Sequence, residues 1–518
     1  MALQNYISPN IKRKMGKDAW QQNLQSIIFA ADKVRSTFGP KGAYKMVIYN
    51  KGPEQVVKIM KDAIAILDEL AIQYPPSVII AESAKMQREE AGDGVASFVI
   101  FLSALLKSAN KLMDTGFHAN TIIHGYNLAL ERALNVLDNQ GTRLNDDILD
   151  TVDCGRNLLF PNLRLMIRDA YVQALDEGTF DREGIRFLKK KGGSIKDSNL
   201  VMGVVLKRDK AHPNMPDRLT DLRIAITSKR LGIDRLSVKM RGEGPSEIKL
   251  NIKSADQISR YREVEKKLRT QFMQKLDEQK INVLLCEQPI EEEQKTLLLS
   301  NGIFALERVE KKDSQAVAKA TGAKIVGNLK ELTNQEVGLA QELFVDKIEL
   351  EKTVTFKSCK GATFLLRGNL SQEIDELEVA IRNSMTILKL LDSDNRVLAG
   401  GGAIEMQLAE ELKQYAKTFS SKEQIVIEAF ADALVDIPRC LAENYGLNPT
   451  DVIIQLKQGH AEGLHDFGVS DRGCKSKVCS EPIKVKRSIL RRGYEVSSLI
   501  LKIDELLISK DIAKFHKK

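Results

Sequence analysis

Apolar residues recur every three or four positions in long stretches toward both ends of the chain. In the first stretch, residues 18–38, the apolar positions at helical spacing are Leu24, Ile27, Ile28, Ala31 and Val34. This period predicts a helix that ends at Gly39. The pattern next predicts a short strand at 46–49 and the beginning of a helix at 59–70. A long buried helix is predicted after Gly94, with Gly116 as its end. The same spacing predicts helices over 373–390, 403–415 and 423–445.

The middle of the chain has a different pattern, in which short apolar runs alternate with charged helical stretches. The predicted strands are 201–206, 222–227, 281–286, 303–306, 324–326 and 362–366. A charged helix over 258–276 follows a glycine-containing loop at 241–245. Alternation of this kind is typical of an α/β layer. We therefore predict a multidomain α and α/β protein.

Three glycine-bracketed turns interrupt the helical blocks: Gly39-Pro40-Lys41-Gly42, Gly92-Asp93-Gly94 and Gly400-Gly401-Gly402. Glycine lets backbone N–H groups converge on an anion at little steric cost, and a helix N-terminus adds a favourable dipole. We predict that the three turns form one split nucleotide pocket. Because they lie in both helical blocks, the α/β region is expected to be an insertion into one helical domain.

Asp93 is the predicted metal ligand of this pocket. Carboxylate and phosphate oxygens are what Mg²⁺ prefers, so ATP with magnesium is the predicted ligand. Simpler interpretations stay open. The glycines can be ordinary turn residues, Asp93 a helix N-cap, Asp62 a partner of the helix dipole in its first turn, and 400–402 a flexible linker.

Composition limits the class of protein. At 518 residues the chain exceeds the size of one core, so two to four domains are expected. Its 78 basic and 70 acidic residues are interleaved and leave a net charge of +8. The only dense basic runs are 189–191 and 484–492, and they lack the aromatic residues that stack on bases. We interpret them as solvated faces and expect no nucleic-acid partner.

Targeting and redox signals are weak. The first 17 residues have no apolar core, and no window reaches the roughly eighteen apolar residues of a membrane span, so a cytosolic protein is expected. The six cysteines lack the spacing of zinc ligands, and only Cys474 and Cys479 lie close together in the sequence. These two are predicted to be free thiols in one surface hairpin or, alternatively, to form a local disulfide. The six histidines form no cluster, so no metal beyond magnesium is expected.

Several motifs in register resemble the group II chaperonins, the archaeal thermosome and its eukaryotic relatives, with a style closer to the archaeal proteins. The motifs are 35–42 (RSTFGPKG), Lys45-Met46, Lys61-Asp62, Gly92-Asp93-Gly94, Gly400-Gly401-Gly402-Ala403 and 428–434 (EAFADAL). Weaker matches lie at 191–194, 282–286, 320–323 and 481–482. Together they span nearly the whole chain.

The resemblance implies three domains and a ring. The implied boundaries are 1–140 and 398–518 for an equatorial ATP domain, 141–206 and 359–397 for an intermediate hinge, and 207–358 for an apical domain. Residues 241–267 would form a helical protrusion that acts as a lid, whereas periodicity alone favours a plain surface helix that packs one stripe on the sheet. The family's subunits assemble as two stacked rings, homomeric or mixed, that enclose unfolded polypeptides.

This chain departs from the family pattern at the expected catalytic positions, which are Asp62, Asp93 and the position of Asn383. In the family an aspartate after an Asp-Glu-x-Glu pattern polarises the attacking water, whereas 375–378 here leads to Asn383. An amide cannot accept a proton, so general-base assistance worth about a hundredfold to ten-thousandfold should be lost. The threonines usual after the second turn are Val95, Ala96 and Ser97, which keep the backbone amides and one hydroxyl for nucleotide binding.

Two further departures concern neighbouring loops. The family has Asp-Gly at the position after Lys61, where this chain has Asp62-Ala63. The family's Thr-Gly-Lys turn, whose lysine lies near the γ-phosphate, corresponds here to the divergent stretch 151–162, and Arg156 is the candidate to replace that lysine. We predict a pocket that binds nucleotide and hydrolyses it slowly. The alternative is activity retained through Asp62 and Asp93.

Four functions compete. The first is a chaperonin ring subunit, and the second is a nucleotide-binding architectural subunit of a mixed ring without hydrolysis of its own. A metabolic phosphotransferase would be a monomer or dimer, so a particle near a megadalton would exclude it. A nucleic-acid-binding scaffold, suggested only by the net charge, would bind DNA with strong salt dependence.

Overall fold

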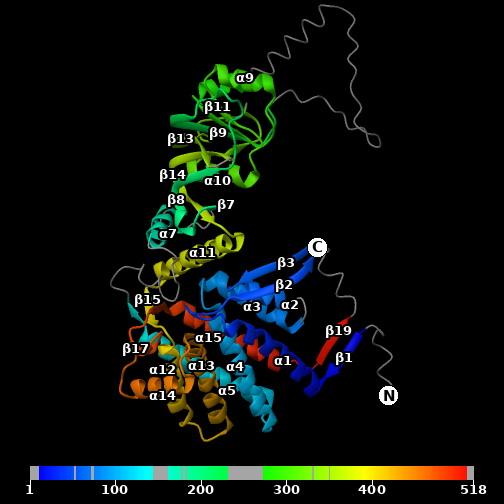
Figure 1. Cartoon of the computed structure of the whole chain (residues 1–518), viewed down its shortest axis with the longest axis vertical. Helices are drawn as coiled ribbons and strands as arrows, with labels where there is room; N and C mark the ends of the chain where they lie inside the picture. The colour runs from blue at the N-terminus through cyan, green and yellow to red at the C-terminus, as the bar shows by residue number, and fades with distance from the viewer. Residues whose placement is uncertain are drawn as a thin grey trace, which may run out of the picture. The chain divides into compact units, whose positions relative to one another are not determined.

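The computed structural model describes residues 11–51, 54–71, 75–143, 162–176, 179–180, 184–231, 272–329, 332–348, 351–503 and 505–509. The chain divides into two compact units. Unit 1 joins both chain ends, Met1–Arg164 and Asp375–Lys518, and unit 2 is the intervening Leu165–Ile374. Unit 1 is mostly helical and unit 2 contains the large sheet, so the predicted split helical domain with an inserted α/β region is confirmed (Figure 1).

The helices of unit 1 come from both ends of the sequence. They are α1 (Gly16–Arg35), α2 (Ala63–Ala71), α3 (Pro75–Ala91), α4 (Val95–Asp114), α5 (Ala119–Gln140), α12 (Ala403–Ala416), α13 (Lys422–Tyr445), α14 (Pro449–Ala461) and α15 (Ile483–Leu501). Small antiparallel sheets accompany them: β1 (Ile11–Met15) with β19 (Glu505–Ser509), β2 (Lys45–Lys51) with β3 (Glu54–Met60), β16 (Phe467–Ser470) with β17 (Gly473–Ser476), and β4 (Thr142–Arg143), β15 (Arg396–Ala399) and β18 (Ser480–Pro482) together.

Helix α4 forms the centre of the unit 1 core. It begins after Gly94, whose left-handed φ of 80° only glycine adopts easily, and its apolar residues are buried on nearly all sides. Phe101 on α4 meets the ring of Phe430 on α13 edge-on at 5.3 Å between centroids, and Tyr126 on α5 meets Phe430 at 5.5 Å. One core thus joins segments more than three hundred residues apart.

Contrary to our expectation from the sequence, α4 is also long and apolar enough to cross a membrane by composition alone. Most of this helix is buried inside unit 1, however, as is usual for the central helix of a soluble core.

Unit 2 is built around an eight-stranded mixed sheet. Its strands and the other unit 2 elements are β5 (Leu175–Asp176), β6 (Thr179–Phe180), β7 (Ile185–Lys191), η3 (Ile195–Asp197), β8 (Asn199–Leu206), β9 (Arg218–Thr227), β10 (Val283–Cys286), α9 (Glu292–Ser300), β11 (Phe304–Leu306), α10 (Lys311–Thr321), β12 (Ile325–Val326), β13 (Gly338–Ile348) and β14 (Glu351–Gly368). Helices α7 (Asn162–Gln173) and α11 (Ser371–Ser393) span the two divisions between the units.

The strand order of this sheet is β11-β10-β9-β13-β14-β7, with β12 also pairing with β9 and β8 with β14. Strands β9, β10 and β11 are parallel, and Ile224 lies opposite Val283, which lies opposite Phe304. All three side chains are fully buried. Parallel strands covered on both faces require such continuous apolar runs, which explains why the sequence pattern predicted them correctly.

Some predictions require correction. Ile59 and Met60 belong to β3, and the helix starts only at Ala63. The expected helix over 59–70 was placed too early because a β-branched apolar run fits both a strand and a buried helix. Cys474 and Cys479 carry thiols and no disulfide. They do not share one surface hairpin, because Cys474 lies on β17, which pairs with β16, and Cys479 directly precedes β18, which pairs with β15. The protrusion (241–267), the loop at 241–245, most of the helix over 258–276, and Arg156 lie outside the described residues.

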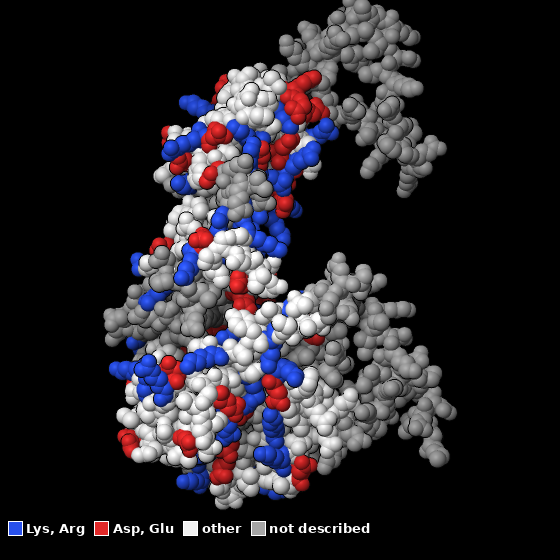
Figure 2. All heavy atoms as spheres, in the orientation of Figure 1, with Lys and Arg blue, Asp and Glu red and all other residues white. Residues whose placement is uncertain are grey.

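Charged side chains cover both units without segregating by sign. Figure 2 shows lysine and arginine interspersed with aspartate and glutamate over the visible face. Many are paired: Arg132 with Glu411 at 3.3 Å in unit 1, for example, and Arg208 with Glu310 at 3.1 Å in unit 2. Pairs of this kind favour solubility and contribute little each to stability.

Candidate functional site

The first glycine turn follows α1 directly. Thr37 Oγ1 donates to Val34 O at 2.8 Å and ends the helix, and Gly39 then takes a left-handed φ of 82°. A Cβ on Gly39 would lie 2.6 Å from Cδ1 of Leu441, and one on Gly42 would lie 2.1 Å from the carbonyl oxygen of Thr37. At Gly42 the clash is with backbone, so this position excludes any side chain, whereas at Gly39 the left-handed backbone is the main reason for glycine because the Leu441 side chain can move.

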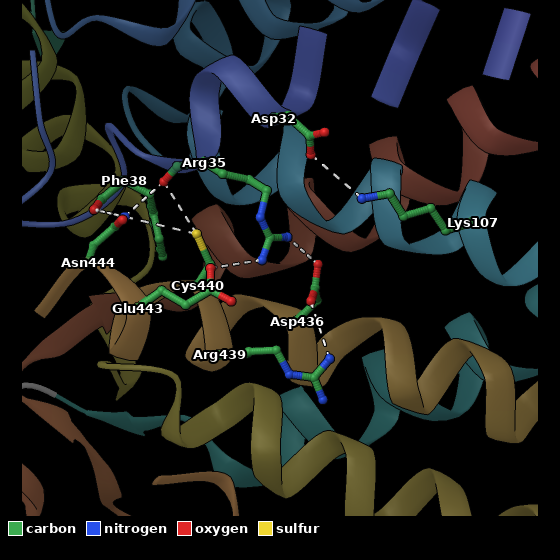
Figure 3. A network of polar contacts seen from close by, with 9 residues as sticks. All are labelled: Asp32, Arg35, Phe38, Lys107, Asp436, Arg439, Cys440, Glu443 and Asn444. Carbon is green, nitrogen blue, oxygen red and sulfur yellow. Dashed lines mark hydrogen bonds and ion pairs between the residues drawn. The ribbon is translucent and has the colours of Figure 1, made fainter. Parts of the chain in front are cut away.

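A polar network ties this turn to α13 (Figure 3). The amide nitrogen of Asn444 donates to the carbonyl oxygens of Arg35 and Phe38, each at 2.8 Å. Arg35 forms ion pairs with Asp436 and, at 3.2 Å, with Glu443. Burial opposes the charge of this guanidinium, but the two carboxylates outweigh it and raise the pKa of Arg35 above its ordinary value. The start of the turn is thus fixed by side chains from the far end of the sequence.

The second turn connects α3 to α4. Gly92 N donates to Arg88 O at 2.8 Å, and Gln87 Nε2 donates to the carbonyl of Asp93 at 3.0 Å. Gly94, and not Asp93, occupies the N-cap position of α4, so the N-cap interpretation of Asp93 is wrong. The half-exposed Asp93 thus precedes the helix N-terminus, where the backbone N–H groups of α4 favour an anion.

The three residues after this turn lie in the first turn of α4. Val95 and Ser97 are buried at 7% exposure each, and Ala96 is half-buried. Their contribution to a ligand would come first from backbone amides, since the side chains of Val95 and Ala96 carry no donor.

The third turn leads from β15 into α12. Gly400 N donates to Cys479 O at 2.8 Å, and Gly401 O accepts from Val469 N at 2.8 Å. Gly401 and Gly402 are both left-handed, and Gly402 is the N-cap of α12. Buried and hydrogen-bonded on both sides, this segment is an ordered turn, so the flexible-linker interpretation is wrong.

Helix α13 brings the first and third turns together. Pro438, Leu441 and Asn444 are spaced by three residues and therefore share one face. A Cβ on Gly402 would meet Pro438 Cβ at 2.6 Å, whereas Leu441 and Asn444 contact the turn at Gly39. One helical face thus touches two segments that lie more than 350 residues apart in sequence.

Helix α15 does the same for the second and third turns. A Cβ on Gly94 would lie 2.7 Å from Ile489 Cδ1, and Lys486 on the same helix forms ion pairs with Glu405 on α12 and, at 2.8 Å, with Glu481. Burial alone would lower the pKa of the Lys486 ammonium, but the two carboxylates raise it, so this lysine stays charged. A Cβ on Gly400 would lie 2.7 Å from Glu481 Oε1, which places this charge network against the third turn.

Asp62 lies between the first two turns. Its Oδ2 accepts from Ala65 N at 3.0 Å, which makes it a cap of α2, and its Oδ1 is ion-paired with Arg88 on α3. The neighbouring Lys61 donates from Nζ to Pro40 O at 3.1 Å. Partial burial lowers the pKa of Lys61 despite the nearby Glu376. Asp62 thus serves the helix dipole, as one alternative supposed, and also holds a guanidinium.

Helix α11 contributes Glu376 and Asn383, which are seven residues apart and share a face. A Cβ on Gly92 would lie 2.9 Å from Asn383 O, so Asn383 adjoins the second turn. Burial raises the pKa of Glu376, with the Asp62 charge adding to the rise and hydrogen bonds from the Lys61 backbone and the Tyr44 side chain opposing it. Glu376 therefore holds its proton more tightly than an ordinary glutamate.

The residues present suit Mg²⁺ only together with a nucleotide. Among the described residues no group of three His, Cys, Asp or Glu side chains is arranged to hold a metal ion. Mg²⁺ is commonly bound by one or two carboxylates plus substrate phosphates, and Asp93 beside the helix N-terminus fits that donor set.

The sequence identified the glycines but missed Arg88, Lys486 and Asn444, which carry no motif signal because their importance comes from contacts with distant segments. Glu376 lay in the Asp-Glu-x-Glu pattern and Glu481 in one of the weaker motif matches, but neither was assigned a role. Lys486 is buried, so the interpretation of 484–492 as a solvated face is wrong at this residue.

Comparison with known proteins agrees with this architecture. The TCP-1/cpn60 chaperonin family matches residues 30–511. The chain belongs to this family. The thermosome subunit alpha of Archaeoglobus fulgidus is 32% identical over 97% of this chain and 94% of its own length. The thermosome subunit of Pyrococcus abyssi is 33% identical over 97% and 93%, and the thermosome subunit alpha of Saccharolobus solfataricus 34% over 96% and 92%.

The match defines this chain as a diverged TCP-1/cpn60 chaperonin. The matched interval contains all three turns together with Asp62, Arg88 and Asn383. The similarity runs through both units, so the inserted α/β region belongs to the chaperonin architecture and is no foreign domain.

Proposed function

We propose that this chaperonin is a ring subunit that binds ATP and encloses unfolded polypeptides. The observation that carries the proposal is the convergence of three ordered glycine turns on α13 and α15, within a chain that matches thermosome subunits over almost its full length. The relatives are named as subunits, and this chain is proposed to assemble likewise, as a double ring of identical or homologous chains in the cytosol.

The β2–β3 hairpin supports assembly. Met46 is 62% exposed and lies opposite Ile59, and Ile48, 54% exposed, lies opposite Val57. Paired apolar side chains on the open face of a two-stranded hairpin mark a surface that another protein chain covers. A neighbouring subunit is the proposed partner, and neither a membrane nor a nucleic acid is invoked.

In the proposed nucleotide site, the three turns and the start of α4 surround the phosphates, and the N–H groups at the start of α4 bind them. The residues are Gly39, Pro40, Gly42, Gly92, Gly94, Val95, Ala96, Ser97, Gly400, Gly401 and Gly402. Pro40 has no N–H, and the N–H groups of Gly42, Gly92 and Gly400 donate to Gly39 O, Arg88 O and Cys479 O, so these four residues shape the turns. Asp93 holds Mg²⁺, which would neutralise phosphate charge when bound. The proposed domain boundaries are those predicted from the sequence, with the protrusion over 241–267 as the lid.

Hydrolysis by this subunit is proposed to be slow. Asn383 adjoins Gly92, where the family's aspartate would polarise water, and its amide accepts no proton. Asp62, the other proposed catalytic carboxylate, is paired with Arg88. These two observations also favour the second candidate, an architectural subunit of a mixed ring that retains nucleotide.

Calorimetry of the purified chain with ATP, combined with light scattering, tests the proposal. We expect ATP binding and a particle near a megadalton. A monomer that takes up no nucleotide would contradict it. Steady-state ATPase of the chain alone and mixed with a cognate partner subunit separates the two candidates. Asn383→Asp tests the degraded site: a rise of about a hundredfold over wild type places the proton acceptor at 383, and an unchanged rate assigns that role elsewhere.

A further inference from the structure

Arg88 lies between two of the proposed phosphate-binding turns. Its carbonyl accepts from Gly92 N at 2.8 Å, so the residue is one helical turn before the second glycine turn. Its side chain is paired with Asp62, and the adjacent Lys61 donates to Pro40 in the first turn. A continuous run of contacts therefore leads from the first turn to the second through this guanidinium.

The guanidinium retains donors that the protein does not use. A guanidinium carries five N–H donors on three nitrogens. Nη2 donates to Asp62, whereas the buried Nε has no protein acceptor, and 23% of the side chain remains exposed. Buried polar groups are nearly always hydrogen-bonded, so an unpaired guanidinium N–H beside two anion-binding turns indicates an anionic partner.

Asp62 holds the guanidinium in place without satisfying it. The same carboxylate accepts from Ala65 N at 3.0 Å and caps α2, which restricts its own movement. It can thus orient Arg88 toward the turns. It also competes with any anion for the positive charge.

We propose that Arg88 is a phosphate ligand of the nucleotide site, oriented by Asp62 as its counter-ion. The proposal rests on the proposed function, because the phosphate belongs to the nucleotide. The planar donors of arginine match phosphate oxygens in pairs, and charge-assisted bonds of this kind are among the strongest in proteins. Arg88 thus adds a positive charge beside the phosphates that does not depend on a bound metal.

The test compares Arg88→Gln with Asp62→Asn. If the ion pair between these residues were purely structural, the two substitutions would have the same effect on ATP affinity. Arg88→Gln should weaken ATP binding by about tenfold to a hundredfold in EDTA, and less for AMP, which has fewer phosphates. Asp62→Asn should leave ATP affinity unchanged or raise it, because the competing charge is removed while the asparagine still caps α2. Opposite signs support the proposal, and equal losses in both variants overturn it.

Controls keep the outcomes separate. Arg132→Gln removes an arginine with an ion pair to Glu411 away from the turns and should not change ATP affinity. Arg88→Lys keeps the charge without the planar fork and should lose less than Arg88→Gln. If Arg88→Gln does not fold, Asp62→Asn and Arg88→Lys decide, and a loss of affinity in Asp62→Asn contradicts the proposal. Wild type that binds no ATP overturns the proposed function as well, whereas wild type and Arg88→Gln with equal ATP affinity overturn only the role of Arg88.

Discussion

The side chain of Asn444 on α13 donates a hydrogen bond of 2.8 Å to the carbonyl oxygen of Phe38, the residue that precedes the first glycine turn. The two residues are separated by 406 positions. This contact and the bond from the same side chain to Arg35 O are two of the points at which the C-terminal half of unit 1 fixes the conformation of an N-terminal turn. The turn is therefore an element of the assembled unit and does not depend on local sequence alone.

Asn444→Ala should destabilise unit 1 and weaken ATP binding together. The substitution removes two hydrogen bonds, each worth about 0.5–1.5 kcal/mol net, so a loss of about 1–3 kcal/mol in the free energy of unfolding is expected. Denaturant titration measures it. The control is Asn127→Ala, which removes an exposed bond to Glu131 and should change neither quantity. A stable Asn444→Ala variant with normal ATP affinity would show that the turn does not need this contact.

Gly402→Ala should be more damaging than Gly446→Ala, although both glycines are left-handed, with φ of 81° and 77°. At Gly446 a Cβ meets nothing within 4 Å, so the cost is backbone strain of about 1–2 kcal/mol. At Gly402 the same atom would collide with Pro438 at 2.6 Å, which forces α12 and α13 apart. We expect Gly402→Ala to lower the melting temperature more than Gly446→Ala does. Gly402→Ala should also lose ATP binding, whereas Gly446→Ala should keep it. Equal effects would mean that the close approach is unimportant.

Lys486→Met should cost about 3–5 kcal/mol, because it leaves the carboxylates of Glu405 and Glu481 without their partner. Adding Glu405→Gln should recover part of that loss by removing one of the uncompensated charges. Chemical denaturation of the single and double variants measures both effects. A double variant less stable than Lys486→Met would argue against charge burial as the cause. Lys484→Met, whose ammonium bonds the exposed Ser393 side chain, is the matched control.

The contribution of Glu376 to stability should depend on pH. Burial raises its pKa, so the folded protein binds this proton more tightly than the unfolded chain does. The corresponding stabilisation is complete below the ordinary value of 4.5 and is lost as the pH rises through the raised value. Glutamine never ionises, so Glu376→Gln should match wild type in melting temperature at low pH, exceed it increasingly as the pH rises from 4.5 through the raised pKa, and keep a constant advantage above it.

Glu131→Gln, at an exposed position on α5, is the control for this experiment and should show no such gain. A constant difference between Glu376→Gln and wild type at every pH would indicate that Glu376 has the same pKa in the folded protein as in the unfolded chain, which contradicts a raised pKa.

The sequence alone determined the elements and their broad arrangement. The three-to-four-residue period predicted α1, α4, α11, α12 and α13, and continuous apolar runs predicted the buried strands β9, β10 and β11. These patterns are local and repeat many times, so each element is specified by its own residues. Glycine at 39, 94, 401 and 402 likewise marked positions where the backbone takes a left-handed conformation. Because these turns lie in both helical blocks, the sequence also predicted that the two blocks form one split helical domain.

Only the tertiary structure decided how the turns meet. Nothing local indicates that Asn444 reaches Phe38, that Gly402 touches Pro438, or that Arg88 takes the carboxylate of Asp62. The boundary at Ile59 and Met60 was misplaced for a related reason, since pairing with β2 made a strand of residues whose period also suits a helix. Periodicity fixes which face of a helix is buried, but the segment that covers this face is chosen by the packing of the whole core, which no window of neighbouring residues contains.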